Sequence, residues 1–233
     1  MSILSIIQDA CKLQSLTRPT VVIASTDLTV QQLLGFAIEE CQELNKLWWQ
    51  LMTREQTFLT VATAEQTNAF PSDFDRFWPE SFFNRSTNRP VVGPVTVQQW
   101  QLIQSNSAAG LITLAYRQRD GVFLVTPTPP AGQTIAYEYI STKWARSADL
   151  STAQLRWEVD TDTSYFDEWL ITLGVIWRWR ARKGLPHDED YDKWETRRDQ
   201  LMANDGGTTK LSFAPPCNGY VPPLPTVPEG FSW

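Results

Sequence analysis

The sequence predicts an α+β fold: a helical bundle with an inserted small antiparallel β meander and an extended Pro-rich C-terminal arm. Three observations lead to this prediction. Apolar residues recur every three or four positions towards both ends of the 233-residue chain, strand-like segments gather in its middle, and prolines crowd its last part. The helices on the two sides of the insertion are expected to pack together, because neither set alone can bury its apolar faces.

Residues 1–56 are predicted to supply the first helices of the bundle. Ser2 can cap a first amphipathic helix. Thr29 with Gln32 matches the capping-box pattern, which predicts the start of a second, longer helix. Its apolar positions continue from Val30 to Leu51 at helical spacing, the clearest periodicity in the chain.

Residues 57–145 are predicted to form the β insertion with one short helix. Segment 57–63 has strand composition, and Thr96 with Gln99 predicts a helix over 97–104. Three later segments joined by short turns are typical of an antiparallel meander. These strands are expected at residues 111–116, 122–126 and 134–141.

The stretch from Phe70 to Trp100 marks the change from helices to strands. It is rich in aromatic residues but broken by four prolines, so it can be neither a long helix nor a central strand. Its aromatic side chains are expected to lock the β insertion onto the helices. They are Phe74, Phe77, Trp78, Phe82, Phe83 and Trp100.

Residues 146–205 are predicted to complete the bundle with two helices. Ser164 can cap the first, and Gly184 followed by Pro186 ends it in the expected order. The second covers about 188–203 and is strongly charged. The apolar side of the first helix is expected to hold Phe166, Trp169, Leu170, Leu173, Ile176 and Trp177.

Residues 206–233 are predicted to be an extended arm, because they contain six prolines and no periodicity. Disordered tails are poor in aromatic residues, whereas this one keeps several. Such anchors can lie along the body of the same chain or along a neighbour, and a neighbour is the favoured prediction. The predicted partner-binding residues are Phe213, Tyr220, Leu224, Phe231 and Trp233.

Composition limits the classes of function. The net charge of −6 argues against a nucleic-acid binder, which needs a basic surface. Three cysteines without a CxxC pair predict no structural disulfide and a reducing compartment. The N-terminus has no signal-peptide pattern and no segment resembles a membrane span, so folding in the cytoplasm is expected. Eleven tryptophans favour a tightly packed core or a large subunit interface.

No catalytic residue, metal site or cofactor is predicted. The only histidine, His187, lies in a loop, and no Gly-x-Ser-x-Gly elbow occurs. Segment 160–164 imitates the start of an EF-hand loop, but Tyr165 and Ile171 occupy the positions of the turn glycine and the bidentate glutamate. The aromatic and basic segment 177–183 is interpreted as structural, since alternate residues of a helix do not share a face.

Two alternatives from other functional classes remain open. Asp73, Asp75 and Glu80 lie among aromatic residues and could serve as the carboxylates of a virion-associated cell-wall glycan hydrolase. Exposed tryptophans could instead serve a carbohydrate-binding tail module. Such modules are usually all-β, so the predicted long helix counts against the second alternative.

The order and character of these elements resemble a known family. Two N-terminal helices are followed by a β insertion with Phe58-Leu59 and Pro71-Ser72-Asp73-Phe74, and then by a helix with Tyr165-Phe166-Asp167-Glu168-Trp169-Leu170. A charged helix and an extended tail complete the pattern. It resembles the head-to-tail adaptor (connector) proteins of tailed bacteriophages, in particular the tail tubular protein A-like class of short-tailed phages. The similarity covers about residues 1–205 and rests on element order, with no fingerprint motif.

This resemblance implies a structural virion protein at the head–tail junction, assembled in the host cytoplasm. Such proteins form a ring, usually of twelve copies, that docks beneath the portal protein and continues the DNA channel. The β insertion faces outward or towards the distal tail or nozzle protein, and the arm clasps the portal or an adjacent subunit. DNA would pass without specific binding, helped by the negative charge of this chain. The family contributes no catalytic residue.

Overall fold

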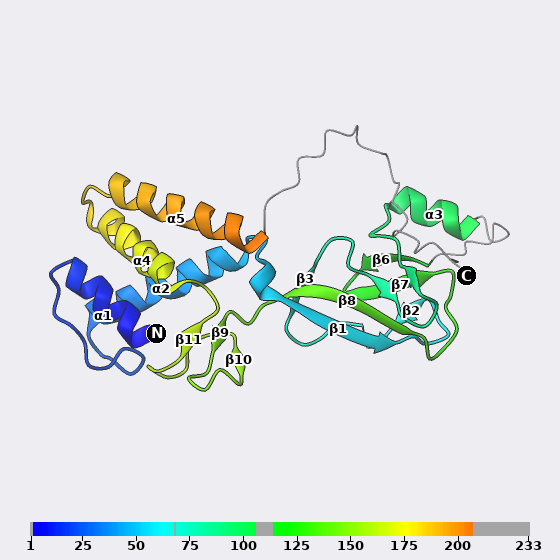
Figure 1. Ribbon diagram of the computed structural model, residues 1–233, viewed down its shortest axis with the longest axis horizontal. Helices are drawn as coiled ribbons and strands as arrows, with labels where there is room; N and C mark the ends of the chain where they lie inside the picture. The colour runs from blue at the N-terminus through cyan, green and yellow to red at the C-terminus, as the bar shows by residue number, and fades with distance from the viewer. Residues whose placement is uncertain (1, 68, 106–113, 207–233) are drawn as a thin grey trace, which may run out of the picture.

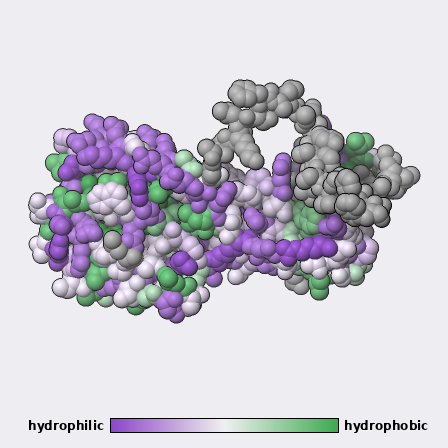
Figure 2. All heavy atoms as spheres, in the orientation of Figure 1, coloured by the Kyte–Doolittle hydropathy of each residue, from purple (hydrophilic) through white to green (hydrophobic). Residues whose placement is uncertain are grey.

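A computed structural model gives the architecture of residues 2–67, 69–105 and 114–206. The molecule is elongated, with a helical bundle at one end and a β region at the other (Figure 1). Figure 2 shows hydrophobic and hydrophilic surface interspersed on the bundle, whereas a hydrophilic band crosses the β region. The mixed α+β class predicted from the sequence is confirmed.

Four helices build the bundle around α4 (Glu168–Lys183), which packs against α1, α2 and α5. The other three are α1 (Ile3–Leu13), α2 (Leu28–Asn45) and α5 (Asp188–Gly206). Helices from before and after the insertion therefore share one core, as the sequence predicts. Residues Ile3, Leu33 and Leu170 are fully buried in it.

Of the three helix caps predicted for the bundle, one is confirmed and two are wrong. Ser2 caps α1, and its capping box is closed by Ser5. Thr29 does not cap α2, because the carboxylate of Asp27 accepts a hydrogen bond from the Thr29 amide at 2.8 Å. Ser164 likewise does not cap α4, because Asp167 does so through the amide of Leu170. In both wrong predictions an aspartate occupies the N-cap position, directly before the first helical residue.

The end of α2 also differs from the prediction. The helix stops at Asn45 instead of continuing to Leu51, and a short 3-10 turn, η1 (Gln50–Met52), follows. The indole of Trp49 donates to the carbonyl of Leu44 at 2.9 Å. A side chain thus satisfies a carbonyl that the next helical turn would otherwise have bonded.

The main sheet has five strands, in the order β1-β8-β4-β5 with β3 also paired to β8. All its pairs are antiparallel. Its strands are β1 (Thr53–Leu59), β3 (Phe74–Phe77), β4 (Phe83–Asn84), β5 (Arg89–Pro90) and β8 (Thr134–Ser141). The first strand begins at Thr53, before the predicted Thr57, directly after η1.

Two three-stranded sheets and one helix complete the described chain. The first sheet has the order β2-β7-β6 and belongs to the β region; the second has the order β10-β9-β11 and lies beside the bundle (Figure 1). Helix α3 (Val97–Ser105) has the predicted Thr96–Gln99 capping box. The remaining strands are β2 (Glu65–Gln66), β6 (Ala115–Arg119), β7 (Val122–Thr126), β9 (Ala145–Arg146), β10 (Ala153–Gln154) and β11 (Thr163–Ser164).

The predicted three-stranded meander is wrong in one respect. Strands β6 and β7 form the expected hairpin, turning at Asp120 and Gly121 with positive φ angles. Residues 111–113 of the first predicted strand lie outside the described residues. Strand β8 pairs with β1, β3 and β4 and not with β7. It is buried along both faces, which requires neighbours from more than one part of the chain.

The β region has its own core, which is mainly aromatic. Phe82 stacks on Tyr137 with ring centroids 4.6 Å apart, and Phe77 meets Tyr137 at 5.4 Å. The aromatic residues of the junction stretch therefore mostly fill this core and do not lock the insertion onto the helices. Trp78 is the exception, because it packs against the bundle core and lies edge-on to Trp48 at 5.6 Å.

Candidate interaction surfaces

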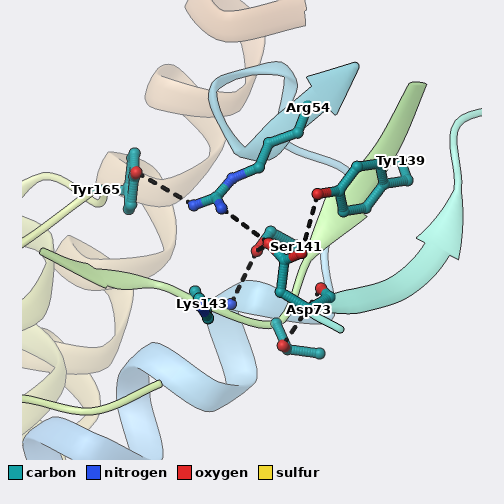
Figure 3. A network of polar contacts seen from close by, with 7 residues as sticks. Arg54, Asp73, Tyr139, Ser141, Lys143 and Tyr165 are labelled. Atoms are coloured by element: carbon teal, nitrogen blue, oxygen red, sulfur yellow. Dashed lines mark hydrogen bonds and ion pairs between the residues drawn. The ribbon is translucent and has the colours of Figure 1, made fainter. Parts of the chain in front are cut away.

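Asp73 lies at the junction of the two regions, at the centre of a polar network (Figure 3). Its carboxylate is 2.8 Å from Nη1 of Arg54 and accepts hydrogen bonds from Ser141 Oγ at 2.6 Å and from the Tyr139 hydroxyl at 3.0 Å. Nη2 of Arg54 donates to the hydroxyl of Tyr165 at 3.2 Å. The network thereby joins strands of the main sheet to the segment that precedes α4.

The environment of Asp73 keeps its carboxyl ionised. Burial acts to raise the pKa of this group, but hydrogen bonds from Ser141 and Tyr139 and the charge of Arg54 outweigh it and lower the pKa below its usual value. Burial, together with the hydrogen bond to Asp73 and the charge of its carboxylate, raises the pKa of Tyr139 to about 12. A glycosidase acid needs the opposite shift, so Asp73 is suited to holding the junction together and not to donating a proton.

The other two carboxylates of the hydrolase alternative are placed differently. Asp75 pairs with Arg76 at the surface, and Glu80 is exposed in a turn with φ of 57°. Asp73, by contrast, is directed into the polar network (Figure 3). No feature of the described residues supports an acid–nucleophile pair at these positions.

Arg76 makes a second connection between the β region and the bundle. Its Nη2 donates to the carbonyls of Asn45 at 2.8 Å and Leu47 at 2.6 Å, and its guanidinium lies 4.9 Å from the ring centroid of Trp48. The carbonyls at the end of α2 have no partners within the helix. A residue of β3 therefore caps the C-terminus of a bundle helix.

The basic and aromatic segment 177–183 is largely used inside the bundle, as predicted. Arg178 is buried and forms an ion pair with the fully buried Glu40, which also accepts from the Trp194 indole at 2.7 Å. Arg180 pairs with Asp190 at 2.6 Å. These cations are not available as a phosphate-binding surface.

The aspartates of segment 160–164 also have structural roles. Asp160 accepts from the amides of Val22 and Ile23, and the buried Asp162 accepts from Glu158 and Val159. These carboxylate oxygens bond to backbone amides of the surrounding loops. Within the described part of the chain, no group of three or more His, Cys, Asp or Glu side chains could hold a metal ion.

A groove lies between α5 and the start of α4 and is here called the α4–α5 groove. Its outer hollow of about 400 Å³ is lined by Trp169, Leu173, Lys193, Thr196, Arg197 and Gln200, among others. Its inner hollow of about 270 Å³ is lined by Trp49, Leu51, Phe166, Leu201 and Asp205, among others. The two adjoin, because Arg197 of the outer hollow pairs at 3.1 Å with Asp167 of the inner one.

This groove was not predicted from the sequence. Trp169 was assigned to the apolar, buried side of α4, yet 48% of its surface is exposed. It lies in the first turn of α4, and α5 side chains such as Lys193 and Arg197 line the hollow beside it without burying it. Spacing places Trp169 on the same face as Leu173 but cannot show how far a neighbouring helix extends over that face.

The predicted partner-binding residues Phe213, Tyr220, Leu224, Phe231 and Trp233 lie outside the described residues. Within the described ranges, no helix is both long enough and apolar enough to cross a membrane.

Comparison with known proteins decides the family. The SU10 adaptor protein family model matches residues 1–215, a range that includes both the bundle and the β region. The chain belongs to the SU10 adaptor protein family. No curated protein matches it. The resemblance to phage head-to-tail adaptors is thereby confirmed. This SU10-family adaptor is a phage structural protein and a virion component. The family is not known for enzymes.

Proposed function

We propose that this adaptor forms a ring, of twelve copies, that docks on the portal protein and joins it to the distal tail or nozzle protein. The observation that carries the proposal is the family match, which extends over both structural regions. The elongated shape supports it, because a chain with two separate cores can contact a different neighbour with each end (Figure 1). Heterologous contacts that repeat by rotation close into a ring.

The ring would continue the channel through which the genome leaves during ejection. The net charge of −6 supports passage without binding, since repulsion of phosphate keeps DNA from adhering to the wall. Assembly would take place in the host cytoplasm before the tail is completed. No measurable affinity of the purified adaptor for duplex DNA is expected at physiological salt.

The arm would provide a further contact with the portal or an adjacent subunit. Its aromatic and apolar residues give an extended segment the anchors that it needs to bind a preformed surface. The proposed partner-binding residues are Phe213, Tyr220, Leu224, Phe231 and Trp233.

Analytical ultracentrifugation of the adaptor alone and mixed with its portal tests this function. We expect a complex with the portal whose mass corresponds to a ring of adaptor copies, whether or not the free protein forms a ring. An adaptor that remains a monomer and never sediments with the portal would rule the proposal out. A chain truncated after Pro215 should bind the portal more weakly than the full chain if the arm contributes.

A further inference from the structure

The α4–α5 groove leaves apolar side chains uncovered beside the helix from which the arm leaves. Trp169 is half exposed in the outer hollow, and Leu51 is 38% exposed in the inner hollow. Charged side chains such as Lys193 and Arg197 line the outer hollow. An apolar floor beside charged side chains fits a short segment that carries apolar anchors.

The starting point of the arm is fixed next to the inner hollow. The carboxylate of Asp205 accepts hydrogen bonds from the amides of Gln50 and Leu51 in η1, the latter at 3.2 Å. Helix α5 ends at Gly206, and Gly207 follows. Two successive glycines allow backbone conformations that a chain reversal needs.

The segment after this point has a suitable sequence. Leu211 and Phe213 are separated by one residue, so in an extended chain both side chains point to the same side and Ser212 points away. The family match ends at residue 215, just beyond Phe213. The family match therefore covers residues 207–215, and residues 216–233 lie beyond it.

The segment after Gly206 is long enough to reach both hollows of the groove. Thr196 of the outer hollow precedes Gly206 by ten positions, which is about 15 Å along a helix. Phe213 follows Gly206 by seven positions, which an extended chain spans in up to about 23 Å. Leu211 can reach the inner hollow by the same measure. A reversed segment thus reaches both hollows of its own chain.

We propose that residues 207–215 fold back along α5 and seat Leu211 and Phe213 in the α4–α5 groove of the same chain. The arm that reaches a partner then begins at Pro216 and keeps Tyr220, Leu224, Phe231 and Trp233 as its anchors. For Phe213 this inference replaces the partner-binding role proposed above, because Phe213 then belongs to the folded body. This inference concerns the free chain and does not depend on the ring or the portal.

Disulfide trapping in the full-length chain tests the proposal. In a Cys217→Ser background, Thr196→Cys is combined with Ala214→Cys, which leaves Phe213 intact. The matched control combines Thr196→Cys with Ser232→Cys. Under mild oxidation at micromolar protein, the 196–214 pair should form an intrachain disulfide about tenfold faster than the control, because a docked segment has the higher effective concentration. Non-reducing gels and peptide mass spectrometry give the rates and the linkage.

Equal rates for the two pairs, or 196–214 links that form only between chains, would overturn the proposal. Truncation provides a second measurement. Ending the chain after Pro215 should leave the melting temperature unchanged, whereas ending it after Gly206 should lower it by about 2–4 °C or more. Equal melting temperatures for the two truncations would also overturn it. Both measurements use the free protein, so failure of portal binding does not affect them.

Discussion

The bundle and the β region are stabilised by different kinds of core. The bundle core is built mainly from aliphatic residues and tryptophans around one buried ion pair, Glu40 with Arg178. The β core is built largely from stacked phenylalanines and tyrosines, among them Phe82, Phe123 and Tyr137. Polar contacts at the junction, from Asp73 and Arg76, connect the two. A destabilising substitution in either core should therefore lower the stability of its own region first.

Phe82→Ala should have the largest effect. Phe82 is buried between Tyr137 and Phe123, and its truncation should reduce the free energy of unfolding by about 4 kcal/mol. Urea unfolding followed by tryptophan fluorescence, and by hydrogen exchange of the β8 amides as the β signal, measures this loss. The half-buried neighbour Phe83 gives the control Phe83→Ala, with a smaller loss. If the tryptophan signal, which comes mainly from the bundle side, shifted as much as the β signal, the two cores would unfold as one unit.

Gly174→Ala should be next in size and act on the bundle. A Cβ atom at this position would clash with the Cδ atom of Glu40, so the buried pair with Arg178 must move. We expect a loss of about 3 kcal/mol, in the range for breaking a buried ion pair. Gly35→Ala in α2 is the matched control, because a Cβ atom there meets nothing within 4 Å, and it should be neutral or stabilising. Equal losses for both variants would contradict the role of Glu40.

Asp73→Asn should weaken the junction by about 2 kcal/mol at neutral pH, since it removes charged hydrogen bonds from a buried site. The pKa of Asp73 is lowered in the folded protein, so its stabilisation is present above the usual pKa of an aspartate and is lost as the pH falls through the folded value. The difference between wild type and Asp73→Asn should therefore shrink on acidification below pH 4. Unfolding measured at several pH values checks this, and Asp75→Asn at the surface should show little change at any pH. A difference that is constant with pH would contradict the prediction.

Arg76→Ala should have the smallest effect, about 1–2 kcal/mol, because it removes two hydrogen bonds to the end of α2. Arg85→Ala, which breaks an exposed pair with Glu55, is the control and should change the free energy of unfolding very little. Hydrogen exchange of the amides near Asn45 should increase in Arg76→Ala and not in Arg85→Ala. Unchanged exchange there would show that α2 ends without help from the β region.

Sequence reasoning was successful where structure depends on neighbours in the chain. Periodicity located the bundle helices, and the short turn between the first two predicted meander strands identified the β6–β7 hairpin. It failed where contacts join distant segments. The pairing of β8 with β1 spans most of the insertion, and Asp73 meets Ser141 from 68 positions away. Neither leaves a local pattern, because the partner is selected by three-dimensional packing.

The candidate interaction surfaces show the same difference between local features, which the sequence can predict, and contacts between distant segments, which it cannot. The anchors in the arm stay a prediction, which was made from composition alone because an extended tail with aromatics is unusual. The α4–α5 groove could not be predicted from the sequence, because it depends on how closely α5 packs beside Trp169. The hydrolase alternative rested on three carboxylates close in sequence, and the structure assigns Asp73 to a network of interior contacts instead.

The β1–β8 ladder has a mechanical consequence if the protein joins two large assemblies, as proposed. Both strands join the bundle at the same end, β1 through η1 and β8 through Thr142 to Trp144. A pull on the far end of the β region is therefore transmitted along two covalent chains side by side. The interstrand hydrogen bonds are not opened one after another by such a load. Both strands of the ladder therefore stay connected to the bundle even when the other strands of the β region are displaced.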